Sequence, residues 1–144
     1  IALPPLFTEQ HVALCAPGHP MAGRSVTLAQ FMAQPLVLRQ RGSGAFQLFS
    51  AAVAQAGYTP RPAWQCASVQ AILAAVGLGL GVTVLPRQVA AAALDAGQLA
   101  VIRVQGLDVH STVCLAVHKS KFLSPALGHF MDMARALAQP QTGE

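Results

Sequence analysis

Residues 63–86 of the chain, AWQCASVQAILAAVGLGLGVTVLP, decide its fold class. They predict a strand at Ala63–Ala67, a helix capped by Ser68, a glycine turn, and a second strand at Gly81–Leu85 that Pro86 ends. The helix is supported by apolar residues that recur on one helical face: Val69, Ile72, Leu73, Val76 and Leu80. Apolar strands that alternate with helices are typical of an α/β fold with a mainly parallel sheet.

The same alternation continues on both sides of this segment. Upstream, the pattern predicts strands at His11–Ala16 and Pro35–Arg39, a helix at Thr27–Ala33, and a helix from Ala45 that stops at Gly57. Downstream, it predicts a helix at Gln88–Ala96, strands at Leu99–Val104 and Ser111–His118, and a last helix that starts at Ser124-Pro125. The last helix has an amphipathic stripe formed by Leu127, Phe130, Met131, Ala134, Leu137 and Ala138.

The composition excludes several classes of protein. Nine Lys and Arg stand against five Asp and Glu in 144 residues, which gives a net charge of +4, and only 10% of residues are charged. A hydrophobic content of 53% excludes a disordered chain, and the absence of a Lys/Arg cluster argues against a nucleic-acid surface on this chain. The apolar run Ala71–Leu85 is shorter than the roughly 18 residues that a membrane span needs, so we expect no membrane contact.

Cysteine and histidine spacing predicts neither a disulfide framework nor a metal site. The three cysteines, Cys15, Cys66 and Cys114, form no CxxC pair, and each lies in an apolar strand-like run. We interpret them as reduced cysteines that serve as small hydrophobic side chains. The five histidines show no HxxxH pattern, and the five acidic residues are scattered.

No motif predicts an enzyme or a cofactor. The chain has no GxSxG and no phosphate-binding GxxxxGK[ST] sequence. The glycines of Gly77–Gly81 superficially resemble a dinucleotide loop, but they follow a helix and precede a strand, which is the reverse of the required order. We therefore expect no catalytic residues, no metal and no cofactor, and we interpret this segment as a helix-to-strand turn.

One loop has the character of a ligand site. The segment Arg39–Phe46, RQRGSGAF, joins the carboxyl end of a strand to the start of a helix, where backbone N–H groups are free to bind an anion. Its glycines let a ligand approach the backbone, Ser43 adds a hydroxyl, and the arginines Arg39 and Arg41 add positive potential. The residues alone leave two interpretations equally open: an anion cradle, or a helix cap at Ser43 with Gly42 as a turn residue.

Two further strand ends are weaker candidates of the same kind. Ser68 follows the strand at Ala63–Ala67, and its role as a helix cap alone is the simpler interpretation. Pro86 closes the next strand and is placed to line the same crevice, although packing explains it equally well.

Six landmarks in register resemble the effector-binding domain of LysR-type transcriptional regulators over residues 7–137. They are HVALCAPGHP (11–20), VTLAQF (26–31) before PLVLR (35–39), RGSG (41–44), Ser68 with VGLGLG (76–81), VLP (84–86), and KFLSP (121–125) before Phe130. The resemblance implies a type II periplasmic-binding-protein-like lobe, in which helices flank a mixed, mainly parallel sheet, with a C-terminal helix added.

The resemblance also implies a division of the chain. Residues 1–8 would be a crossover segment from a first lobe, 9–119 the second lobe, and 120–144 the C-terminal helix that returns to the first lobe, with a frayed tail. Because the chain starts at Ile1 without a Met, we expect it to be a fragment that lacks most of the first lobe and the N-terminal winged helix-turn-helix.

In this family small effectors, often organic acids or other anions, bind between the two lobes. The resemblance assigns ligand contacts to the loop residues Gly42, Ser43, Gly44 and Phe46, and less firmly to Ser68 and Pro86. It implies a cytoplasmic sensor domain that oligomerises and contacts DNA only through the N-terminal domain. The alternative is a solute-binding protein of a transport system with the same fold. We expect the fragment to self-associate through the apolar stripe of its last helix.

Overall fold

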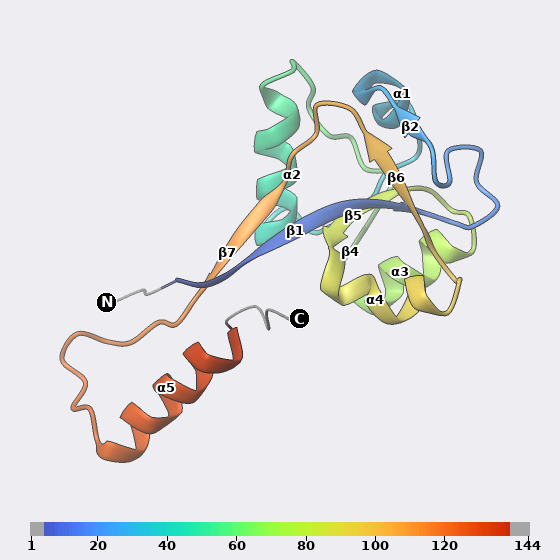
Figure 1. Ribbon diagram of the computed structural model, residues 1–144. Helices are drawn as coiled ribbons and strands as arrows, with labels where there is room; N and C mark the ends of the chain where they lie inside the picture. The colour runs from blue at the N-terminus through green and yellow to red at the C-terminus, as the bar shows by residue number, and fades with distance from the viewer. Residues whose placement is uncertain (1–4, 139–144) are drawn as a thin grey trace. The chain divides into compact units, whose positions relative to one another are not determined.

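The computed structural model describes residues 5–138, which form seven strands and five helices (Figure 1). Two compact units are distinguished: Gln10–His110, and Ile1–Glu9 together with Ser111–Glu144. The elements in chain order are β1 Pro5–Cys15, β2 Ser25–Val26, α1 Leu28–Met32, β3 Val37–Arg39, α2 Gly44–Ala54, β4 Trp64–Cys66, α3 Val69–Gly77, β5 Thr83–Pro86, α4 Arg87–Asp95, β6 Ala100–Val104, β7 His110–Cys114 and α5 Pro125–Ala138.

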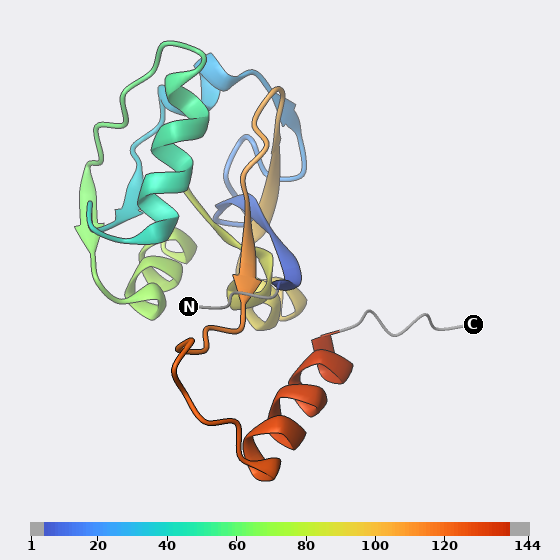
Figure 2. The ribbon, with the colours of Figure 1, turned by 90° about the vertical axis from the view of Figure 1, so that its left-hand side faces the viewer.

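The sheet is mixed, as the family resemblance implies. Strand β1 runs antiparallel to both β5 and β6, while β6 pairs in parallel with β2, and β7 also pairs with β1. Strands β3 and β4 form a second parallel pair (Figure 2). A parallel bridge between Leu36 and Val82 joins β3 to β5, so β4, β3 and β5 all point the same way.

Alternation along the strands sends side chains into two hydrophobic clusters, one on each face. Leu36 and Leu38 belong to the cluster that contains Phe49 and Val53 of α2, in which the rings of Phe31 and Phe49 pack edge to face at 6.4 Å. Val37 belongs to the other cluster, with Ile72, Leu73 and Val76 of α3 and Ala90 of α4. Helices therefore cover both faces of these strands, which confirms the predicted α/β class.

The helices begin within one residue of the predicted positions. Ser68 caps α3, as expected, and Thr27 caps α1 in a capping box with Gln30. Helix α2 begins at Gly44, one residue before the predicted Ala45, and ends at Ala54; Gly57, at φ +84°, lies in the turn beyond it. Helix α4 begins directly after Pro86, which is also the last residue of β5.

Some boundaries differ from the prediction. The short strand β2 was not expected; its two residues pair with Arg103 and Val104, a long-range contact that local pattern does not encode. The strand predicted to run from Ser111 to His118 ends at Cys114. The predicted tail from Gln139 lies outside the described residues.

The three cysteines are free, but they do not share one environment. Cys15 is fully buried, and this burial raises the pKa of its thiol to about 11. Cys66 is half-buried, whereas Cys114 is exposed, so the interpretation as a buried hydrophobic side chain is wrong for Cys114. Residue alternation explains this, because Cys114 lies on a strand in which exposed and half-buried positions alternate.

The last helix, α5, begins as predicted at Ser124-Pro125. The hydroxyl of Ser124 accepts a hydrogen bond from the N–H of Leu127 at 3.3 Å. No residue of α5 is buried, and its apolar stripe includes Phe130, which is 59% exposed, and Leu137, which is 82% exposed. Among the described residues, no helix is both long and apolar enough to cross a bilayer.

Candidate functional site

Three parallel strands of the unit Gln10–His110 end at one edge of the sheet. The Cα register pairs Arg39 of β3 with Cys66 of β4, and the bridge at Leu36 and Val82 aligns β5 with them. Each strand leads into a helix: β3 into α2, β4 into α3, and β5 into α4. The amino ends of three helices therefore follow these strand ends, which is where open α/β sheets bind ligands (Figure 2).

The predicted loop is a tight turn with an N-cap. The backbone N–H of Ser43 donates to the carbonyl of Gln40 at 2.9 Å, which closes the turn. The hydroxyl of Ser43 accepts a hydrogen bond from the N–H of Phe46 at 3.2 Å, and Gly44 is the first residue of α2. Ser43 is thus a helix cap, which is one of the two interpretations that the sequence left open. Its hydroxyl can also donate to an oxyanion, so the cap and the cradle are compatible.

The glycines of this loop are not required by the backbone or by packing. Gly42 and Gly44 are exposed and do not have a positive φ. A Cβ atom added at either position would meet no atom within 4 Å. A side chain at either position would therefore extend into open space near the amino end of α2.

The second and third strand ends place Ser68 and Pro86 at the same edge. The Ser68 hydroxyl accepts a hydrogen bond from the N–H of Ala71 at 3.2 Å, and its own N–H donates to the sulfur of Cys66 at 3.4 Å. Pro86 is half-buried and pairs across the sheet with His11 of β1. His11 is itself buried, a feature that its sequence context does not indicate.

The electrostatics of this edge are positive. None of the first turns of α2, α3 and α4 contains an acidic residue, and Asp and Glu are also missing from the three connecting segments 39–46, 66–71 and 86–90. Arg39 and Arg41 lie in the first connection. Arg87, which the sequence pattern did not single out, is the first residue of α4, a position where a helix favours negative charge. The three connecting segments thus contain three arginines and no carboxylate.

Phe46 faces different surroundings from the other predicted residues. It lines a cavity of about 300 Å³ on the flank of α2, together with Arg41, Ser50, Ala54, Tyr58, Thr59 and Pro60. Neither Ser68 nor Pro86 lines this cavity.

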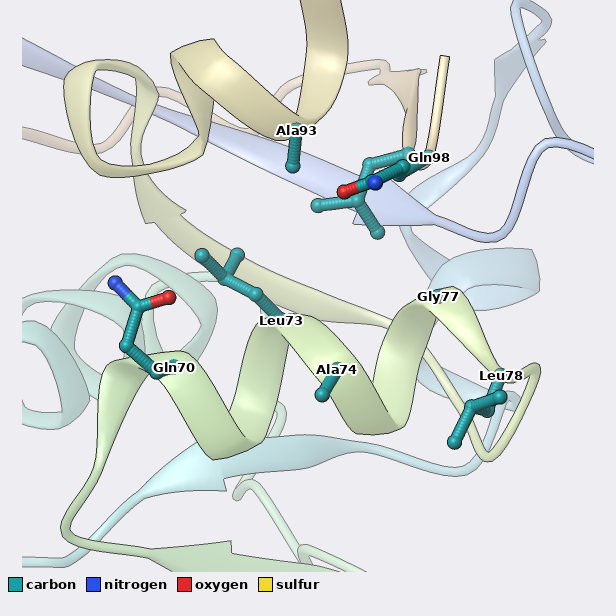
Figure 3. A pocket seen from close by; sticks show the side chains of 8 residues that line it. Gln70, Leu73, Ala74, Gly77, Leu78, Ala93 and Gln98 are labelled. Atoms are coloured by element: carbon teal, nitrogen blue, oxygen red, sulfur yellow. The ribbon is translucent and has the colours of Figure 1, made fainter. Parts of the chain in front are cut away.

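A second cavity, of about 470 Å³, lies between α3 and α4. Figure 3 shows Leu73 of α3 and Ala93 of α4 pointing toward one another across it. Its lining consists of Gln70, Leu73, Ala74, Gly77, Leu78, Ala93, Gln98 and Leu99. It contains no charged side chain and none of the predicted site residues, so it does not match the expected anion site.

Among residues 5–138, no group of three His, Cys, Asp or Glu side chains is arranged to hold a metal ion.

Comparison with known proteins assigns the family. A model of the LysR substrate binding domain matches residues 2–139. The chain belongs to this family. It is 34% identical over 128 residues to the HTH-type transcriptional regulator YeiE of Escherichia coli, and 31% identical over 122 residues to the RuBisCO operon transcriptional regulator of Allochromatium vinosum. These matches cover 89% and 84% of the chain but only 44% and 40% of the relatives, so the chain spans less than half of their length.

Solved structures show the same fold. The regulatory domain of Synechocystis CcmR, in complex with 2-PG, matches with a TM-score of 0.88 and 20% identity over 97% of this chain and 68% of that one. The effector binding domain of QuiR, in complex with shikimate, matches with a TM-score of 0.82 and 20% identity over 97% and 66%. The predicted family and fold are thereby confirmed.

Proposed function

We propose that this chain is the sensing part of a LysR-type transcriptional regulator and that its effector is a small anion. The family match favours a regulator over a solute-binding protein of a transport system. Two structural relatives, the regulatory domain of CcmR with 2-PG and the effector binding domain of QuiR with shikimate, are complexes with small molecules. In this proposal the chain catalyses no reaction.

One observation supports the anionic nature of the effector more than any other. Three helix N-termini follow the ends of β3, β4 and β5, together with three arginines and without any carboxylate in the connecting segments. Helix N-termini bind anions because their first N–H groups lack acceptors and their dipoles are positive there. The proposed contacts are Gly42, Ser43, Gly44, Phe46, Ser68 and Pro86.

We propose the division that the family resemblance implies, in which 1–8 form a crossover, 9–119 the second lobe and 120–144 a helix that returns to a first lobe. The compact unit Gln10–His110 lies within 9–119. An effector held between two lobes favours the conformation in which both lobes contact it. Its differential affinity for two conformations then shifts their populations, which is how binding would control DNA contact in the cytoplasm.

The test replaces Ser43 by leucine in the intact regulator. Ser43→Leu removes an N-cap and fills the loop, and we expect a regulator that folds but no longer responds to organic acids in a promoter assay. Thr27→Leu is the matched control, because it removes the cap of α1 at about the same cost of roughly 1 kcal/mol. An unchanged response in the Ser43 variant, or equal loss in both, would reject this site.

We further propose that the chain self-associates through α5. Two large side chains of its apolar stripe, Phe130 and Leu137, are exposed, and exposed apolar patches tend to associate. Sedimentation velocity should show concentration-dependent association of the chain, and substitution of Phe130 and Leu137 by serine should reduce it. A strictly monomeric profile at high concentration would contradict this proposal.

A further inference from the structure

The side chain of Arg39, the last residue of β3, has a buried hydrogen-bond donor that is not used. Its Nε atom is shielded from solvent and has no hydrogen-bond partner among the described residues. The ion pairs found among residues 5–138 are His110 with Asp108 and Arg135 with Asp132, so no carboxylate of this part of the chain pairs with Arg39. By contrast, Arg103 donates to the carbonyl of Gly23 at 3.0 Å.

The position of Arg39 follows from strand alternation. Val37 packs in the cluster with Ile72 and Leu73 of α3, and Arg39, two residues later, extends from the same face of the sheet. Its register partner is Cys66, two residues before the N-cap Ser68. Four residues after Arg39 comes Ser43, the N-cap of α2. Arg39 thus precedes the N-cap of α2 by four residues and pairs with the end of the strand that leads into α3.

This arrangement is unfavourable until an anion binds. A guanidinium that is partly removed from water, with a buried donor unused, loses solvation without compensation. An oxyanion at this edge would relieve that loss, because it would accept hydrogen bonds from the guanidinium and from the N–H groups of a helix that begins there.

We propose that Arg39 is the charge-pairing residue that selects oxyanion groups at this site. The fork of guanidinium donors fits the two oxygens of a carboxylate or two oxygens of a phosphate, whereas neutral hydroxylated molecules offer no partner for its charge. This inference rests on the proposed function, since it assigns the anchor of the same site. It explains why a strand that is otherwise buried ends in an arginine without a counter-charge.

The test uses nuclear magnetic resonance of the ¹⁵N-labelled 144-residue chain. Inorganic phosphate and sodium acetate are titrated separately, with sodium chloride at equal ionic strength as the control. We expect one of the two oxyanions to shift the Nε–H signal of Arg39 and the backbone N–H signals of Gly42, Ser43 and Gly44 with one dissociation constant. The two titrations distinguish a phosphate preference from a carboxylate preference.

Variants distinguish the contribution of Arg39 to anion binding from that of the helix N–H groups. Arg39→Gln should weaken this binding at least tenfold, about 1.4 kcal/mol, and Arg39→Lys, which keeps the charge but loses the fork, should weaken it to a lesser degree. Arg61→Gln removes an exposed loop arginine and should leave the dissociation constant unchanged. Heteronuclear spectra of each variant establish that it is folded.

The outcomes distinguish the two proposals. Equal affinity in the parent and in Arg39→Gln would overturn the role of Arg39 but leave an anion site at the helix ends. A parent chain that shows no saturable shift with either oxyanion would overturn the role of Arg39 and the anionic effector together. Loss of binding in Arg61→Gln as in Arg39→Gln would reduce the effect to net charge and would also overturn the assignment.

Discussion

Two glycine-containing segments of the chain differ in what requires the glycine. In the turn Gly77–Gly81, packing requires it: a Cβ atom on the buried Gly81 would collide with the carbonyl oxygen of Pro35 and lie 3.0 Å from Val37. In the loop Gly42–Gly44, a Cβ atom would meet nothing within 4 Å, and neither glycine has a positive φ. The first segment holds two strands together, whereas the second leaves an open approach to a helix end.

The fold therefore requires Gly81, whereas nothing in the fold requires Gly42 or Gly44, as expected if these two residues belong to the proposed ligand site. The order of elements in the sequence predicted a helix-to-strand turn at Gly77–Gly81, where the glycines are denser, and left Gly42–Gly44 open between a ligand cradle and a helix cap. The close contact at Gly81 agrees with the first interpretation. The following predictions test the contrast, beginning with the largest expected effect.

Substitution of Gly81 should cost the most. Gly81→Ala places a methyl group against Pro35, so β5 must shift away from β3, and we expect the free energy of unfolding to fall by about 3 kcal/mol. Urea denaturation measures this loss. The matched substitution Gly44→Ala should leave stability unchanged or raise it by a few tenths of a kcal/mol. Equal losses at the two positions would remove the contrast.

Thr83, two residues after Gly81, should contribute to stability through the shape of its side chain and not through its hydroxyl. Its side chain is fully buried, and its hydroxyl has no hydrogen-bond partner among the described residues. Thr83→Val keeps the shape and removes the unsatisfied hydroxyl, so we expect a gain of about 1 kcal/mol in thermal unfolding. Thr27→Val, in which the lost hydroxyl caps α1, should lose about 1 kcal/mol. A loss at Thr83 would show that its hydroxyl does form a bond in solution.

The buried thiol of Cys15 should produce a smaller effect that depends on pH. Its pKa is raised from the usual 9.0 to about 11 by burial, so the native chain keeps a proton that the unfolded chain has lost. Stability should therefore decrease as the pH rises from about 9 to 11. Cys15→Ala should show a shallower decrease over this range, and Cys114→Ala, which removes an exposed thiol, should behave as the parent does. Identical slopes in all three would contradict the assigned burial.

Much of this structure follows from local sequence pattern. The helix starts at Ser68 and Ser124 were predicted from caps, and the buried strands from apolar runs. Strand β2 was not predictable, because its two residues depend on pairing with β6 far along the chain. The end of β7 at Cys114 was missed because the apolar run continues beyond the residues that find a partner strand.

The candidate site was predictable only in outline. The strand-loop-helix pattern indicated the loop at Gly42–Gly44. It did not establish that Ser68 and Pro86 lie at the same edge of the sheet as this loop. That follows from the parallel alignment of β3, β4 and β5, which is long-range. Arg39 was noted only for its charge, because burial of its Nε depends on tertiary packing. The one indication of this burial in the sequence was the position of Arg39 at the end of the apolar run PLVLR.

The most direct test of the central contrast is Gly44→Leu in the intact regulator. Thermal unfolding is measured alone and in the presence of a panel of small organic acids and phosphate esters. We predict that the variant alone unfolds within about 0.5 kcal/mol of the parent, and that the stabilisation which an acid confers on the parent is lost. A variant that is stabilised as the parent is, or that is destabilised as Gly81→Ala is, would contradict the view that this glycine is kept for a ligand.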